Sequence, residues 1–105
     1  MSSDYSADIQ KYTSSVNEDA VNSIVKYCGI ALRGKDSSLV SSSDKSELNR
    51  VRDGFAKKKL ELDEAAASAG ISQVVDKMKG EKRKHRVTFY YLLAEATGTM
   101  DKLTG

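Results

Sequence analysis

The feature that most constrains this chain is a segment near its carboxyl end, residues 82–98, which is apolar on almost every side of a helix. At about 100° per residue, the apolar side chains occupy two opposite faces and leave only a narrow polar strip. The positions are Val87, Phe89, Tyr90, Tyr91, Leu92, Leu93, Ala94 and Ala96. Such a helix must be wrapped by other helices or by a second subunit. A buried strand is the alternative, but the segment is long and ends at Gly98, a good helix cap.

The composition favours further helices around this segment. The chain has 105 residues and no proline, where average usage would give about five. A chain of this length can build one modest core. We therefore predict an all-α fold, a single compact bundle of four to five helices around a central C-terminal helix. Residues 1–105 would form one domain, with residues 1–3 and 99–105 frayed.

Two helices are predicted in the first third of the chain. The first begins near Ser3 or Asp4 and is amphipathic. Its apolar stripe is Tyr5, Ile9, Tyr12 and Val16. The second begins after Asn17, a capping residue followed by two acids that suit the positive end of the helix dipole. It ends near Gly34, and its buried face is Val21, Ile24, Val25, Cys28 and Leu32.

A serine-rich loop follows, with Leu39 and Val40 as its apolar anchors. The third helix begins at Asp44, which with Glu47 three residues later resembles a capping box, or it is capped by Ser43 instead. Its stripe is Leu48, Val51, Phe55 and Leu62. The run Lys57–Lys59 then lies near the carboxyl end of the helix, where cations suit the dipole.

The fourth helix is capped by Asp63 and ends at Gly80. Its aligned apolar residues are Ala67, Ile71, Val74, Val75 and Met78. Gly70 lies inside it and costs roughly 1 kcal/mol relative to alanine. The segment is therefore either one weakened helix or a short turn followed by a new cap at Ser72.

The most concentrated charge lies just before the last helix. Residues 77–86 contain six basic side chains and a single acidic one, Glu81. The basic residues are Lys77, Lys79, Lys82, Arg83, Lys84 and Arg86. A helix amino terminus adds free N–H groups and a positive dipole end to such a cluster. The cluster is either solvated surface or a contact for an anion or nucleic acid. The sequence pI of about 8.6 is lower than that of a typical nucleic-acid-binding domain.

Reactive side chains are few. His85 is the single histidine and Cys28 the single cysteine, and neither has a catalytic partner at a specifying spacing. The place of Cys28 on an apolar stripe indicates a small core residue. No nucleotide-binding glycine motif and no metal-ligand cluster is present. We therefore predict no catalytic, cofactor or metal site.

Cys28 also indicates the cellular compartment of the protein. It cannot form an internal disulfide, and a free thiol suits a reducing compartment. The amino terminus has no secretory signal pattern, and the longest apolar run is too short to span a bilayer. These features favour a cytoplasmic protein that is not inserted in a membrane.

Two segments resemble the signature of a small bacterial family of unknown function. They are GFAKKKLELDEA at residues 54–65 and KHRVTFYYLLAEATG at residues 84–98. In that family the later segment commonly reads KYRxxFYYLLA, and the earlier one reads like NFLxKKLGL. His85 stands where the family usually has an aromatic residue, and Glu61 where it usually has glycine. The resemblance implies one domain over nearly the whole chain and brings no activity, cofactor or catalytic residue.

The leading functional expectation is a non-enzymatic protein that acts through protein binding or self-association, with an unknown protein partner or as a homodimer. Its basis is the last helix, because one small core need not cover both of its apolar faces. The interface residues would be Phe89, Tyr90, Leu92 and Leu93. The alternative is an anion- or nucleic-acid-binding module that uses the basic cluster of residues 77–86. A further alternative is an enzyme centred on His85 or Cys28.

Overall fold

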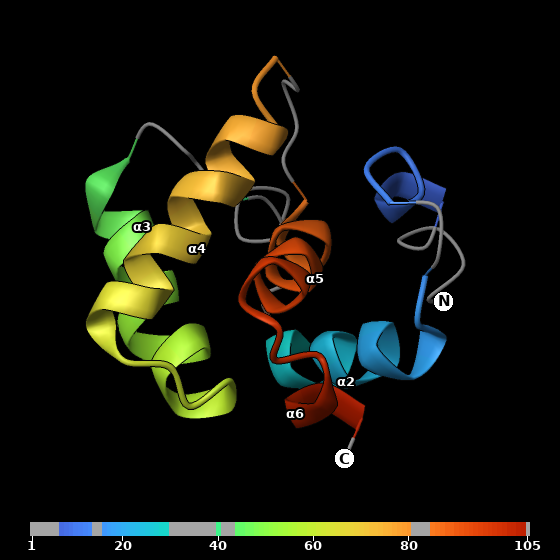
Figure 1. The fold of residues 1–105 in the computed structure, drawn as a ribbon. Helices are drawn as coiled ribbons and strands as arrows, with labels where there is room; N and C mark the ends of the chain where they lie inside the picture. The colour runs from blue at the N-terminus through green and yellow to red at the C-terminus, as the bar shows by residue number, and fades with distance from the viewer. Residues whose placement is uncertain (1–6, 14–15, 30–39, 41–43, 81–84, 105) are drawn as a thin grey trace.

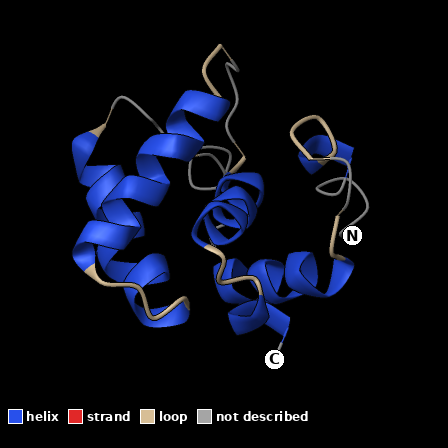
Figure 2. Cartoon of the chain, in the orientation of Figure 1, coloured by secondary structure: helices blue, strands red, loops and turns tan. Residues whose placement is uncertain are grey.

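The computed structural model describes residues 7–13, 16–29, 40, 44–80 and 85–104, and these residues contain helices and no strand (Figure 1, Figure 2). The helices are α2 (Glu18–Cys28), α3 (Lys45–Arg50), the π-helix η2 (Val51–Lys59), α4 (Glu64–Lys77), α5 (Arg86–Thr97) and α6 (Asp101–Thr104). The predicted all-α fold is confirmed. Among the described residues, no helix has both the length and the apolar character needed to cross a bilayer.

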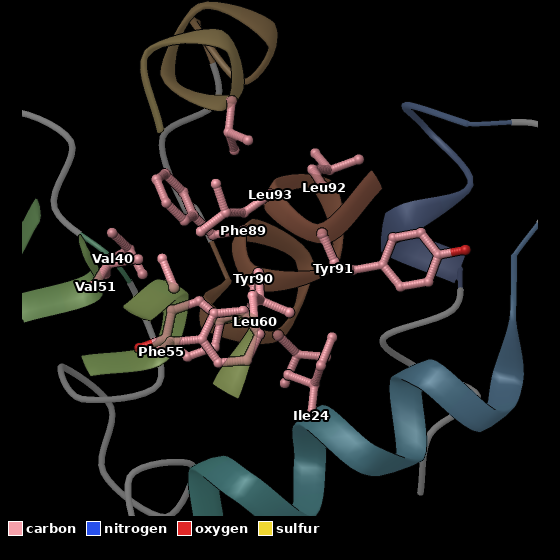
Figure 3. Close-up of a cluster of buried hydrophobic side chains, with 14 of the residues drawn as sticks. Ile24, Val40, Val51, Phe55, Leu60, Phe89, Tyr90, Tyr91, Leu92 and Leu93 are labelled. Carbon is pink, nitrogen blue, oxygen red and sulfur yellow. The ribbon is translucent and has the colours of Figure 1, made fainter. Parts of the chain in front are cut away.

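Helix α5 lies at the centre of the molecule, as its apolar sequence predicts. Figure 1 shows it between α4 on one side, α2 below and the N-terminal segment on the other side. Its residues 87–94 are all buried. In Figure 3, side chains of α5 point toward different elements, with Tyr91 directed at the N-terminal segment. The other elements therefore wrap α5 within a single chain.

Two hydrogen bonds attach the N-terminal segment to α5. The hydroxyl of Thr88 donates to the carboxylate of Asp8. The hydroxyl of Tyr91 accepts from the backbone N–H of Asn17 at 2.8 Å. Thr88 is fully buried, so its pairing satisfies a polar group that would be costly to leave alone inside the core.

The first helix ends earlier than the sequence predicts. Residues 7–9 are helical and the chain then turns at residues 10–12. Ile9 is buried, while Tyr12 and Val16 are half-buried and pack against the core. The predicted start of this helix lies outside the described residues.

Helix α2 begins where predicted and ends earlier. The side chain of Asn17 accepts from the backbone N–H groups of Asp19 and Ala20 at 3.1 and 3.3 Å. The helix ends at Cys28, because Gly29 has a φ of 50°, a conformation that glycine adopts at low cost. The expected positions at Leu32, Gly34 and Leu39 lie outside the described residues. Val40, the other expected anchor, is buried.

The third helix starts in the α form and continues as a π-helix. The carboxylate of Asp44 caps it and accepts from the backbone N–H of Ser46 at 2.9 Å. In a π-helix each N–H bonds to the carbonyl five residues earlier. At the end of η2, the N–H of Leu60 donates to the carbonyl of Phe55 at 3.1 Å. Helix α3 and η2 together thus form one continuous helix, Lys45–Lys59.

The π form decides which residues this segment buries. Its buried side chains are Val51, Phe55, Ala56 and Leu60. At about 80° per residue, a π-helix places all four on one side. At about 100° per residue, an α-helix would turn Ala56 and Leu60 away from Val51. The predicted α-helical stripe therefore contained Val51 and Phe55 and missed the other two.

Helix α4 is continuous through Gly70, which settles the alternative left open by the sequence. Asp63 caps it, with its carboxylate accepting from the backbone N–H of Ala66 at 2.7 Å. A Cβ atom at Gly70 would lie 2.5 Å from a methyl carbon of Thr97 and 2.8 Å from one of Leu93. The glycine therefore lets α4 and α5 approach closely, and this packing offsets its poor helix propensity.

Part of residues 99–105, the segment that the sequence predicts to fray, is helical. Residues 101–104 form α6, and Leu103 is buried. In Figure 1, α6 packs beside α2. Met100 just before α6 also packs against the core, and Lys102 pairs with Glu61 at 3.2 Å, so contacts with distant parts of the chain hold this turn.

Candidate functional site

The basic cluster predicted from the sequence is partly neutralised within the fold. Lys77 pairs with Glu95 at 3.5 Å, and Arg86 pairs with Glu47 at 2.6 Å. Lys79 is exposed. The other three predicted contacts, Lys82, Arg83 and Lys84, lie outside the described residues.

Arg86 has a structural position. Its guanidinium bonds to Glu47 on α3 and donates to the hydroxyl of Tyr90 at 3.0 Å. The exposed fractions of the Arg86 and Glu47 side chains are only 13% and 16%. Burial raises the pKa of Tyr90, and the nearby Arg86 offsets this only in part. A guanidinium held this way joins α3 to α5 and is poorly placed to bind an external anion.

The predicted interface residues belong to the core. Phe89, Tyr90, Leu92 and Leu93 are exposed by 0%, 6%, 1% and 0% of their surface. Elements of the same chain cover both faces of α5, as Figure 3 shows for its labelled side chains. The premise of an uncovered apolar face on this helix is therefore removed.

The two reactive residues lie on different elements, with Cys28 at the end of α2 and His85 at the start of α5. His85 is the N-cap residue of α5 and is half-buried. Burial raises the pKa of the Cys28 thiol to about 11, so the nucleophilic thiolate is scarce at neutral pH. Within the described part of the chain, no three His, Cys, Asp or Glu side chains gather closely enough to hold a metal ion.

A second cationic surface, which the sequence did not predict as a site, lies on α3 and η2. Residues 45–59 carry six basic and two acidic side chains. Both acids are engaged, Glu47 with Arg86 and Asp53 with Arg52 at 2.9 Å. The remaining cations, here called the α3–η2 basic surface, are Lys45, Arg50, Lys57, Lys58 and Lys59.

These five cations keep their charge uncompensated. None of them forms an ion pair with a residue that the structure describes, and Lys57 acts on Asp53 only at longer range. All are exposed except Lys59, which is half-buried. The sequence signal was present as a net charge of +4 over residues 45–59, but the partners of the two acids could not be known.

An aromatic side chain lies beside this surface. Tyr27, at the end of α2, is 44% exposed. Its hydroxyl lies 4.0 Å from the position of a Cβ atom at Gly54 on η2. Its ring contacts Phe55 edge-to-face at a centroid distance of 5.3 Å. The side chain of Tyr27 therefore crosses from α2 onto the face of η2 that contains Gly54.

Two open grooves flank α4. One, of about 410 Å³, lies between α4 and α5 and is lined by both polar and apolar residues, including the Lys77–Glu95 ion pair. The other, of about 430 Å³, lies between α3 and α4. Its apolar lining is Leu48, Ile71 and Val75, and its rim holds Ser72, Asp76 and Lys79.

Comparison with known proteins and families identifies the family of this chain. A comparison with curated proteins found no match. The model of a protein family of unknown function, DUF2853, matches residues 4–101, which is almost the entire chain. The resemblance to a family of unknown function is confirmed at this level, while the local signature at residues 84–98 stays a prediction. The chain belongs to the DUF2853 family.

Proposed function

We propose that this is a cytoplasmic, non-enzymatic binding protein whose ligand is a polyanion held on the α3–η2 basic surface. The observation that carries the proposal is the set of five cations without an acidic partner among the described residues. Their charge exceeds the net charge of the whole chain, which is +2. The proposed site lies on a different helix from the cluster that the sequence predicts at residues 77–86.

The arrangement suits a ligand with repeated negative charge. Arg50 and Lys58 lie four residues before and after Gly54, about one helical turn on either side. Lys57 and Lys59 flank Lys58 and widen the charged band. Repeated phosphates or sulfates can contact several such cations at once and release bound counterions, which makes the affinity fall with salt.

Binding to heparin, a polyanion, tests this proposal. The protein should be retained on immobilised heparin at low salt and released as NaCl rises. Lys57→Gln with Lys58→Gln should lower the NaCl concentration of elution, and the slope of log affinity against log salt should become shallower by about 2. Lys77→Gln with Lys79→Gln removes the same charge elsewhere and should change both quantities much less.

The control pair distinguishes the two surfaces. If the variant at residues 77 and 79 loses more affinity, the predicted cluster binds the ligand and the α3–η2 proposal is wrong. If the unmodified protein is not retained at low salt, polyanion binding itself is wrong. Circular dichroism on each variant checks that its helices are intact.

Self-association is a second candidate, favoured by the groove between α3 and α4. The occupant would be the same groove of a second copy, because Asp76 and Lys79 both line the groove and neither is in an ion pair with a described residue. Across a two-fold axis, Asp76 of each copy can face Lys79 of the other. The apolar side chains of Leu48 and Val75 would then be covered.

Sedimentation velocity over a wide range of concentrations tests the dimer. A dimer should form as concentration rises, and Val75→Glu should abolish it by placing a charge in the apolar contact. Glu64→Ala, an exposed change at the start of α4, should leave it intact. A protein that sediments as a monomer at every concentration would contradict this candidate.

A further inference from the structure

We propose that the polyanion bound by the α3–η2 basic surface is single-stranded nucleic acid, with Tyr27 as a platform on which a base stacks. This inference rests on the proposed function, since it names the ligand of the same surface. Four observations carry it: the exposure of Tyr27, the fixed position of its ring, its contact with η2 and the uncompensated cations around that contact.

The ring of Tyr27 is both exposed and held in a fixed position. Tyr27 is the one large hydrophobic side chain that is exposed among the described residues, at 44%. It is nevertheless held in place, edge-to-face against Phe55 at 5.3 Å and against Tyr90 at 6.4 Å. Phe55 and Tyr90 are themselves stacked at 4.1 Å and buried. An aromatic ring held this way can receive a ligand without losing much conformational freedom.

The ring of Tyr27 contacts η2 close to cations that have no described ion-pair partner. The hydroxyl of Tyr27 approaches η2 at Gly54, the residue midway between Arg50 and Lys58. Lys26 neighbours Tyr27 on α2 and is also exposed. Neither Lys26 nor Arg50 nor Lys58 forms an ion pair with any residue in the described ranges. The exposed ring therefore meets η2 at a residue that has a cation without a described ion-pair partner about one helical turn away on either side.

This combination selects single strands among the polyanions. In a duplex the faces of the bases are stacked on one another, whereas a single strand can offer a base face to an aromatic side chain. Cations along the backbone and an aromatic platform under a base are the two elements of sequence-tolerant single-strand binding. Acidic peptides and anionic lipid headgroups carry charge but no nucleobase, so they cannot provide the base stacking that Tyr27 offers.

The first test uses the unmodified protein and fluorescence anisotropy. The probes are a labelled deoxythymidine oligomer of about 15 nucleotides, its duplex with deoxyadenosine, and an abasic oligomer with the same phosphates. The thymidine oligomer should bind about tenfold more tightly than the abasic one, because only it can stack. Equal affinity for the two would overturn the inference, whatever the behaviour of any variant.

The second test changes the ring. Tyr27→Leu keeps an apolar side chain against Phe55 and should weaken binding of the thymidine oligomer by about tenfold. It should leave heparin binding and binding of the abasic oligomer unchanged. Tyr27→Phe keeps the aromatic face and should bind the oligomer like the unmodified protein.

The outcomes separate this inference from the proposed function. Heparin binding without a preference for the thymidine oligomer would retain the polyanion surface and overturn the nucleic-acid assignment. Binding to polyglutamate or to phosphatidylserine vesicles, with no preference for single strands, would do the same and point to those ligands. Failure to bind both heparin and the oligomer at low salt would overturn the proposed function and this inference together.

Discussion

Gly70 lies where α4 crosses α5, and the crossing leaves no space for a side chain. A Cβ atom there would come within 2.5 Å of Thr97 and 2.8 Å of Leu93. Both contacts are shorter than van der Waals packing allows, and Leu93 is fully buried. A rule based on helix propensity alone favours alanine at this position, so the crossing and the propensity make opposite predictions.

We expect packing to prevail at Gly70. Gly70→Ala should lower the free energy of unfolding by about 1–3 kcal/mol, since the core must shift to admit the methyl group. Ser68→Ala, an exposed change on the same helix, should be nearly neutral. Urea unfolding followed by circular dichroism measures both, and an unchanged midpoint for Gly70→Ala would argue against the close crossing.

Glu61 shows the same conflict in the backbone. It has a φ of 57°, which costs about 1–2 kcal/mol for a residue with a Cβ atom. The carboxylate of Glu61 pairs with Lys102 of α6 at 3.2 Å, but both side chains are largely exposed, so the pair contributes little.

Replacing Glu61 separates the two effects. Glu61→Gly and Glu61→Ala both remove the ion pair, but only glycine relieves the backbone. Glu61→Gly should therefore be more stable than Glu61→Ala by about 1 kcal/mol in urea unfolding. Equal stability of the two variants would mean that the positive φ is not strained.

Among the elements, the continuous helix formed by α3 and η2 is the one whose form and contacts depend most on its neighbours. Its π register brings Phe55 onto Tyr90 of α5, where the two rings stack at 4.1 Å. Its α-helical start places Glu47 against Arg86. One helix thus supplies both the aromatic and the ionic contact to α5, and its opposite side is left with the unpaired cations.

The Glu47–Arg86 ion pair should be important for stability. Glu47→Ala leaves a largely buried guanidinium without its partner and should cost about 2 kcal/mol. Lys102→Ala breaks the exposed pair with Glu61 and should cost no more than about 0.5 kcal/mol. Thermal or urea unfolding of the two variants gives the comparison. Similar losses for both would mean that Arg86 is more hydrated than its 13% exposure indicates.

For the molecule as a whole, three neighbouring groups connect stability to pH. Burial raises the pKa of Cys28 to about 11 from its ordinary 9.0, and it raises the pKa of Tyr27 and Tyr90 above 10.0. In each case the folded state favours the protonated form. The unfolded chain therefore releases these protons first as pH rises, and unfolding becomes easier.

The stability that these three groups contribute should therefore be lost at high pH. It should be fully present below about pH 9 and should fall as pH rises from 9 to 11 and beyond. Urea unfolding at several pH values measures the slope, and Cys28→Ala should make it shallower between pH 9 and 11. Stability that rises over this range would contradict the buried, protonated thiol. Slow alkylation of Cys28 by iodoacetamide at pH 8 is the matching chemical measurement.

Much of the fold was determined by the sequence alone, because it depends on residues close together in the chain. The caps at Asn17, Asp44 and Asp63 act within three residues of themselves. Because α5 carries apolar side chains on nearly all sides, it must be buried on those sides whichever elements cover it. These local properties were sufficient to predict an all-α fold built around the C-terminal helix.

The tertiary structure decided the rest, because the deciding contacts join residues far apart. The hydrogen bond from Asn17 to Tyr91 spans 74 positions, and the Arg86–Glu47 bond spans 39. Only such contacts reveal that Arg86 is engaged and that the cations of α3 and η2 are not. The π register has the same origin, since the i→i+5 form is rarely favoured by sequence and here serves to bury Ala56 and Leu60 beside Phe55. The candidate site is therefore a property of which charges the fold leaves unpaired.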